Sequence, residues 1–233
     1  MNPKQRAAEA AMTFVRDGMV VGIGTGSTAD FFIVALGEAL RSGKLKDIRG
    51  VSTSVQSERR AIELGVPLIP LSADAAPDVT VDGADEIDPQ LNLIKGLGGA
   101  LLREKIVAQN SRLMVVIADS GKSVPKLGAK SPLPVEVAAF AHEVHIPFFR
   151  GLNAEPTLRR DKAGSVYQTD NGNVIYDCRF PGGIDDPSEV EHALARRAGV
   201  VDCGLFLGIA GVALIADDQR VEERRGPLFA PSS

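Results

Sequence analysis

The sequence predicts an α/β fold, in which a doubly wound, mostly parallel, Rossmann-like sheet carries a smaller inserted α+β domain. Over the first two thirds of the chain, short apolar runs alternate with segments of helical periodicity. The pattern changes near SPLPVEV (131–137), where shorter strand-like segments follow. A buried-strand pattern, GVALIAD (211–217), then returns near the end.

The first elements follow from apolar spacing and glycine stops. Residues 4–17 have apolar side chains at helical spacing, and MVVGIG (19–24) is typical of a buried parallel strand. A helix is expected over 29–42 because Gly43 ends its pattern. The next strand, helix and strand are expected at 48–54, 57–65 and 67–71.

Two further strands, DVTVDGAD (78–85) and RLMVVIAD (112–119), each end in aspartate. Between them, LNLIK (91–95) leads through a glycine cluster into a helix at 100–110. Ligands of such sheets bind at the carboxyl ends of the strands, so we expect the site there.

The change of pattern predicts the domain division. Residues 1–130 and 207–233 are expected to form the main α/β domain, and 131–206 the smaller α+β domain. Its expected elements are strands at 156–160, 165–169 and 173–180, a turn at 170–172 and a helix at 187–199. The strand at 211–217 is expected to rejoin the first sheet.

Composition excludes several classes of partner. With 26 Lys+Arg against 30 Asp+Glu the net charge is -4, and no long basic run is present, which disfavours nucleic-acid binding. The chain has no Trp and only 5% aromatic residues, which disfavours a base-stacking surface.

The cysteines, the N-terminal segment and the histidines indicate the compartment of the protein and whether it binds a metal ion. Cys178 and Cys203 are isolated in the sequence, which indicates two small buried side chains in a reducing compartment. The N-terminal segment lacks a signal-peptide core and no apolar run is long enough to span a membrane, so we expect a cytoplasmic protein without membrane partners. The three histidines, His142, His145 and His192, form no metal-ligand pattern.

The segment GIGTGST (22–28) follows a strand and opens a helix, a context suited to phosphate binding by backbone N–H groups. It is not a dinucleotide fingerprint, which would need glycine at Ser27, and no Gly-Lys-Ser/Thr of a Walker loop follows. The alternative is a tight turn capped by Ser27 or Thr28.

The segment Asp82-Gly83-Ala84-Asp85 places two carboxylates around a glycine turn, where they could hold sugar hydroxyls or a metal ion. The alternative is a turn in which an aspartate caps a helix. Lysines nearby in the sequence disfavour binding of a divalent metal ion at this turn.

Lys95 precedes a glycine cluster that lets backbone approach a ligand, and its charge can stabilise a developing oxyanion. Glu104 falls early in the following helix, where a solvated glutamate favoured by the helix dipole is the ordinary alternative. A base that moves a proton between adjacent carbons needs burial, so burial decides between the two.

Lys122, on the loop after the strand at 112–119, is a candidate second phosphate or oxyanion partner. A solvated loop lysine is the alternative.

Together these segments resemble type A ribose-5-phosphate isomerase. The matching strings appear in the family's order over nearly the whole chain: VVGIGTGSTADFF, DVTVDGADEID, LIKGLGGALLREKIVA, VVIADSGK, LPVEV and TDNGNVIYD. The resemblance implies interconversion of D-ribose 5-phosphate and D-ribulose 5-phosphate through an enediolate, in the non-oxidative pentose phosphate pathway, without cofactor. The lysines near Asp82 and Asp85 and the lack of a His/Cys cluster lead us to expect no metal. It also implies a homodimer or homotetramer.

The resemblance also implies roles for individual residues. Glu104 matches the proton acceptor, and Asp82 and Asp85 match carboxylates that aid ring opening. Lys95 lines the reacting end, and Lys122 and Lys4 match substrate-binding lysines, Lys4 near the phosphate. The remaining substrate-binding positions are Thr25, Gly26, Ser27, Thr28, Gly83, Ala84, Gly96, Leu97 and Gly98.

The sequence departs from the family pattern where Leu97 replaces the middle glycine of Lys-Gly-Gly-Gly, and where Gly211 stands in place of an expected aspartate. The first departure bears on substrate positioning.

Alternative functions are an amino-sugar-phosphate deaminase or CoA transferase on a related sheet, or a sugar-phosphate-sensing regulator. The absence of His before Phe140 disfavours the deaminase, and the early first strand leaves no room for a DNA-binding helix pair.

Overall fold

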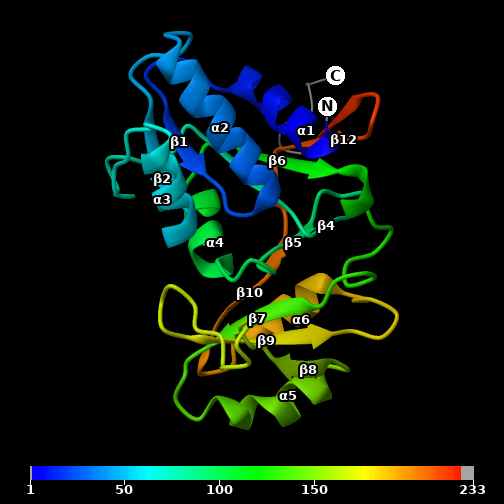
Figure 1. The fold of residues 1–233 in the computed structure, drawn as a ribbon. Helices are drawn as coiled ribbons and strands as arrows, with labels where there is room; N and C mark the ends of the chain where they lie inside the picture. The colour runs from blue at the N-terminus through cyan, green and yellow to red at the C-terminus, as the bar shows by residue number, and fades with distance from the viewer. Residues whose placement is uncertain (1, 227–233) are drawn as a thin grey trace. The chain divides into compact units, whose positions relative to one another are not determined.

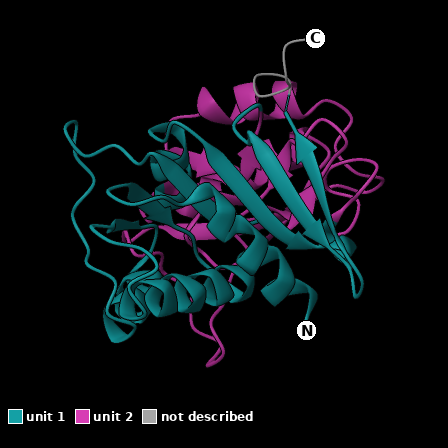
Figure 2. Cartoon of the chain, turned by 90° about the horizontal axis from the view of Figure 1, so that it is seen from above, with its two compact units in different colours: residues 1–84, 103–122, 208–233 teal, residues 85–102, 123–207 magenta. Residues whose placement is uncertain are grey.

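The computed structural model describes residues 2–226 (Figure 1). The chain divides into two compact units, shown in different colours in Figure 2. Unit 1 comprises residues 1–84, 103–122 and 208–233, and unit 2 comprises residues 85–102 and 123–207.

Unit 1 is built on a six-stranded sheet in the order β13-β12-β6-β3-β1-β2. The five strands from β12 to β2 run parallel, and β13 pairs antiparallel with β12 at one edge. The strands are β1 (Val20–Ile23), β2 (Arg49–Ser52), β3 (Val79–Gly83), β6 (Met114–Asp119), β12 (Val212–Ala216) and β13 (Val221–Arg225).

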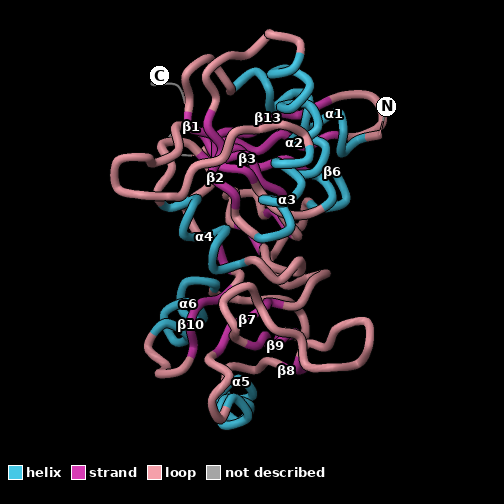
Figure 3. The backbone as a smooth tube through the Cα atoms, turned by 60° about the vertical axis from the view of Figure 1, so that its left-hand side comes forward, coloured by secondary structure: helices cyan, strands magenta, loops and turns pink. Residues whose placement is uncertain are grey.

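Helices cover both faces of this sheet because alternate side chains of each strand point to opposite faces. On one face, Val21 and Ile23 of β1 pack in the core that also contains side chains of α1 (Pro3–Ala11), α2 (Ser27–Arg41) and α3 (Val55–Glu63). On the other face, Val20 packs with Val107 of α4 (Leu101–Gln109). The sheet is therefore doubly wound, and Figure 3 distinguishes its strands from these helices.

Unit 2 contains two antiparallel sheets. The larger has the order β10-β7-β9-β8 and the smaller has the order β11-β5-β4. The strands are β4 (Glu86–Ile87), β5 (Leu93–Ile94), β7 (Leu133–Val137), β8 (Glu155–Leu158), β9 (Val174–Arg179), β10 (Val200–Cys203) and β11 (Leu205–Phe206). Two helices, α5 (Ile146–Gly151) and α6 (Pro187–Ala195), complete the unit.

Three short 3₁₀ helices complete the element order: η1 (Met12–Phe14), η2 (Ser120–Lys122) and η3 (His142–His145).

The predicted fold class is confirmed, and β12 rejoins the first sheet beside β6 as expected. The strand expected at 67–71 is wrong. Only Leu68 bridges to Gly50, because Pro67 and Pro70 flank it and have no N–H to donate to a ladder. Similarly, residues 165–169 form only isolated bridges, at Val166 and Gln168, rather than a strand.

Element ends also differ from the prediction. The first helix ends at Ala11 and continues as η1, and α6 ends at Ala195 rather than near 199. The short strands β4, β5 and β11, the strands β7 and β10, the edge strand β13 and the helix α5 were not predicted.

The bounds of the two compact units differ from those of the predicted domains. The predicted domain division therefore stays a prediction. Residues 85–102 and 123–130 group with unit 2. The pairing of β5 with both β4 and β11 accounts for the first segment. The fully buried Glu86 carboxylate accounts for much of the second, since it accepts hydrogen bonds from the N–H groups of Gly128 (2.6 Å), Lys130 (2.7 Å) and Ser131 (2.5 Å).

Cys178 and Cys203 are buried free thiols, as expected, and burial raises the pKa of Cys178 above its usual value. Among residues 2–226, no helix is long and apolar enough to cross a membrane.

Candidate functional site

The predicted site residues fall into two groups, one in each compact unit. Unit 1 holds Thr25–Thr28, Asp82–Ala84, Glu104 and Lys122, and unit 2 holds Asp85 and Lys95–Gly98.

The glycine-rich loop of unit 1 leads from the end of β1 into α2. Gly26 is the N-cap of α2, with φ 108°, and no side chain caps the helix. The alternative of a turn capped by Ser27 or Thr28 is therefore wrong. The first N–H groups of an α-helix have no partner within the helix, so this end offers donors and a positive dipole to an anion.

Asp82 fixes this loop to the end of β3. Its side chain is 1% exposed, and Oδ1 accepts hydrogen bonds from the N–H groups of Thr25 (3.0 Å) and Gly83 (2.7 Å). Gly24 permits the approach, since a Cβ at that position would lie only 2.6 Å from the Cα of Asp82. The structure thus brings together the glycine-rich loop and the first carboxylate of Asp82–Asp85.

A hydroxyl cluster that sequence analysis missed supports the same loop. The Oγ1 of Thr25 lies 2.8 Å from the Oγ1 of Thr53 and 2.8 Å from the Oγ of Ser54. Ser54 is also the N-cap of α3, in a reciprocal capping arrangement with Ser57. The hydroxyl run Ser52–Ser54 at the end of an apolar strand was the available signal in the sequence.

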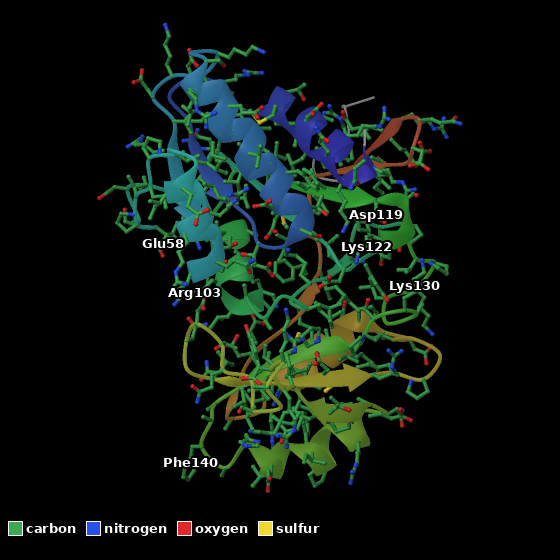
Figure 4. The ribbon with its side chains drawn as sticks, viewed as in Figure 1. Glu58, Arg103, Asp119, Lys122, Lys130 and Phe140 are labelled. Carbon is green, nitrogen blue, oxygen red and sulfur yellow. The ribbon has the colours of Figure 1, made fainter. Side chains whose placement is uncertain are left out.

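Two predicted substrate-binding lysines of unit 1 lie on different elements, Lys4 on α1 and Lys122 on η2. The Nζ of Lys4, in the first turn of α1, donates to the Oγ of Ser27 at 2.9 Å, which places a positive charge at the N-terminus of α2. Lys122 is half-buried on η2, directly after β6, and Figure 4 shows it near Asp119. The carboxylate of Asp119 accepts the N–H of Gly121 at 3.1 Å, which shapes this turn.

Glu104 lies in the first turn of α4 and is 4% exposed. The alternative of a solvated first-turn glutamate is therefore wrong. Its neighbour Lys105 is buried as well, whereas Ile106 is exposed. The buried carboxylate has the setting that a proton-transferring base requires.

In unit 2, Asp85 is tied to the loop that follows β5. Its Oδ2 accepts the N–H of Leu97 at 3.0 Å, and its own N–H donates to the carbonyl of Ile94 at 2.8 Å. The structure thus brings together the second carboxylate of Asp82–Asp85 and the Lys95–Gly98 loop.

Lys95 is held close to β11. It is 2% exposed, its Nζ lies 5.6 Å from the centroid of the Phe206 ring, and its N–H donates to the carbonyl of Gly204 at 2.9 Å. A Cβ at position 204 would lie 2.2 Å from the carbonyl oxygen of Lys95, so glycine is needed there. Position 204 is a second supporting residue that the sequence analysis missed.

The turn after Lys95 uses two glycines with positive φ, Gly96 at 97° and Gly99 at 86°, and the N–H of Gly99 donates to the carbonyl of Gly96 at 2.9 Å. Leu97 is not among the residues with positive φ, and its side chain is 40% exposed. The leucine that departs from the family pattern therefore occupies an unstrained backbone position.

No cluster of three or more His, Cys, Asp or Glu side chains suited to a metal ion occurs within residues 2–226. Two histidines have structural contacts in unit 2. The Nδ1 of His142 lies 2.8 Å from the hydroxyl of Tyr176, and His145 is buried against Phe149. Burial, followed by the charges of Arg197 and His142, lowers the pKa of His145.

Comparison with known proteins identifies relatives along almost the whole chain. The family model described as "Ribose 5-phosphate isomerase A (phosphoriboisomerase A)" matches residues 49–220. Ribose-5-phosphate isomerase A of Roseiflexus sp. (strain RS-1) is 48% identical over 230 residues, covering 99% of this chain and 97% of the relative. The enzyme of Desulfatibacillum aliphaticivorans is 46% identical over 222 residues, covering 95% and 96%.

Solved structures of ribose-5-phosphate isomerases are similar to this chain over almost its whole length. A D-ribose-5-phosphate isomerase in complex with phospho-erythronic acid is similar with a TM-score of 0.93 and 42% identity, over 97% of this chain and 100% of that one. Ribose 5-phosphate isomerase from Plasmodium falciparum has a TM-score of 0.93 and 37% identity, over 96% and 98%.

The backbone at Gly96 and Leu97 yields a paired stability prediction. Leu97→Gly should lower the free energy of unfolding by at most about 1 kcal/mol, the entropy cost of glycine, because no strain is relieved. Gly96→Ala should lower it by roughly 1–2 kcal/mol or more, because position 96 has positive φ. A Cβ there would also lie 2.6 Å from the Cβ of Leu101. Urea unfolding of both variants measures this, and a Leu97→Gly variant more stable than wild type would contradict it.

Proposed function

This chain belongs to the ribose 5-phosphate isomerase A family, and from that premise we propose that Glu104 is the base that moves the proton. The chain interconverts ribose 5-phosphate and ribulose 5-phosphate, as the family match and the similar structures support. The observation that carries the proposed role is the burial of Glu104, which is 4% exposed in the first turn of α4.

The sugar's phosphate is proposed to bind Thr25–Thr28. The uncapped N-terminus of α2 supplies backbone donors there, and Lys4 lies beside Ser27 with a positive charge. Lys122 adds a second charge from the end of β6. The bound phospho-erythronic acid of the similar structure supports a phosphorylated sugar acid or sugar as the kind of ligand.

The remaining residues are proposed to act on the sugar itself. Asp82 and Asp85 accept and return hydroxyl protons as the furanose ring opens, while Gly83, Ala84 and Gly96–Gly98 line the sugar. Glu104 then removes the proton from C2, and the enediolate forms with negative charge on oxygen. Lys95 stabilises that oxyanion. The hydroxyl proton on O2 passes to O1 as Glu104 returns the carbon-bound proton to C1, which leaves the C2 ketone and the C1 hydroxyl of the ketose.

The reaction is proposed to need no metal or cofactor and to serve the non-oxidative pentose phosphate pathway. Lysines such as Lys95 lie near Asp82 and Asp85 in the sequence, and a proton transfer through an enediolate needs only a base and an oxyanion partner. The rate should therefore be unchanged after treatment with EDTA and gel filtration. Loss of activity that one divalent ion restores would contradict the metal-free proposal.

We propose further that the chain acts in the cytoplasm as a homodimer or homotetramer and binds no nucleic acid. The net charge of -4 supports the absence of nucleic-acid binding. Unit 2 has Phe140 at 90% exposed and Val144 at 58%, which supports burial of this segment by a second copy. Light scattering at assay concentration measures the oligomeric state, and a monomer that is fully active would contradict it.

The role of Glu104 predicts that Glu104→Gln abolishes turnover but still binds ligand. The amide preserves size but accepts no proton, and general-base catalysis is worth about 10²–10⁴-fold. Calorimetry with phospho-erythronic acid should give a dissociation constant close to that of wild type.

Glu58→Gln is the matched control, since Glu58 is an exposed first-turn glutamate of α3 in the same unit. It should leave the rate unchanged. A Glu104→Gln variant that retains a tenth or more of the wild-type kcat would show that another residue is the base.

A further inference from the structure

Arg159 has a fixed place beside the Lys95–Gly99 loop of unit 2. It directly follows β8, and its backbone is tied on both sides, since its N–H donates to the carbonyl of Ile175 at 2.8 Å and its carbonyl accepts the N–H of Tyr167 at 3.0 Å. Its side chain is 11% exposed. Such burial of an arginine requires partners for its charge and its N–H groups.

The guanidinium group has these partners in two directions. Towards β9, Nε donates to Oδ2 of Asp177 at 2.9 Å and Nη2 donates to Oδ1 at 2.5 Å, which is a two-point fork. Towards the loop, Nη1 donates to the carbonyl of Gly96 at 3.0 Å and that of Leu97 at 3.2 Å. The guanidinium group thereby makes four hydrogen bonds, through all three of its nitrogens.

The aromatic ring of Tyr167 closes the same cluster. The guanidinium carbon lies 5.8 Å from the ring centroid, within cation–π range. The tyrosine hydroxyl lies 2.1 Å from the position that a Cβ on Gly99 would occupy, so this glycine, with φ 86°, lets the loop pack on the ring. The far end of the loop is thus held as well.

One peptide group connects this cluster to Asp85. The carbonyl of Gly96 and the N–H of Leu97 belong to the same planar peptide, and in a trans peptide they point in opposite directions. Arg159 binds the carbonyl, while Asp85 Oδ2 accepts the N–H at 3.0 Å. Any rotation of this peptide plane would weaken both hydrogen bonds.

We propose that Arg159 is a positioning residue for the isomerisation, which orients the Gly96–Leu97 peptide and through it the carboxylate of Asp85. Asp177 holds the guanidinium in place for this role. The inference rests on the proposed roles of Asp85 and Lys95 in the reaction. Arg159 itself exchanges no proton, because a guanidinium stays protonated in proteins.

Arg159→Lys is the informative substitution, because lysine keeps the charge but cannot reproduce the fork and the two carbonyl contacts together. It should lower kcat by about tenfold or more, as expected when a charged hydrogen bond is lost. KM should change less than kcat, since the proposed phosphate contacts at Thr25–Thr28 are untouched. The exchange rate of the Leu97 amide hydrogen, followed by NMR, should rise in the same variant.

Arg160→Lys is the matched control, because Arg160 is exposed and donates to the carbonyl of Gly164 at 2.8 Å. It should leave kcat and the Leu97 amide unchanged. Arg159→Ala should regain part of its rate in millimolar guanidinium, which can refill the vacated position, while Arg160→Ala shows no such response.

Lys95→Met separates failure of this inference from failure of the proposed function. If Lys95→Met turns over normally, the proposed site itself is wrong. If Lys95→Met is inactive while folded Arg159→Lys has the wild-type kcat and the wild-type exchange rate at Leu97, the positioning role of Arg159 is overturned.

Discussion

The Asp82 carboxylate is the interaction on which the rest of unit 1's proposed site depends. By accepting the N–H groups of Thr25 and Gly83, it joins the loop after β1 to the end of β3. The close approach leaves no room for a side chain at Gly24. The path of the chain into α2 follows from this contact, and with it the uncapped helix end that the phosphate is proposed to occupy. A carboxylate at this point therefore has a structural role in addition to its proposed chemical one.

Unit 2 contains two further carboxylates that accept hydrogen bonds from backbone N–H groups. Asp85 accepts the N–H of Leu97, and the buried Glu86 accepts three N–H groups of the 128–131 segment. Backbone N–H groups stabilise a buried carboxylate without a cation, because their dipoles are fixed by the fold. Arg159 extends the arrangement on the opposite side of the Gly96–Leu97 peptide. Acidic side chains thus shape both the Lys95–Gly98 loop, which the proposed mechanism uses, and the 128–131 segment.

Much of this was predictable from local sequence, and the remainder depends on contacts between distant residues. Apolar runs and glycine stops predicted the parallel sheet, because burial on both faces leaves a clear pattern. The strand β13 was missed because an edge strand such as VEERR is charged and exposed. The burial of Glu104 could not be decided, since a first-turn glutamate is usually solvated. Arg159 gave no signal because its partners, Asp177 and Gly96, are 18 and 63 residues away in the chain.

In the proposed mechanism a carboxylate transfers a proton between C1 and C2 through an enediolate. Equilibration of ribose 5-phosphate with the enzyme in D₂O tests it most directly, with deuterium followed by NMR over many turnovers. Deuterium should accumulate at C1 of the ketose and C2 of the aldose with wild type, and at neither carbon with Glu104→Gln. Interconversion to equilibrium without deuterium incorporation would indicate direct hydride transfer and would contradict the account.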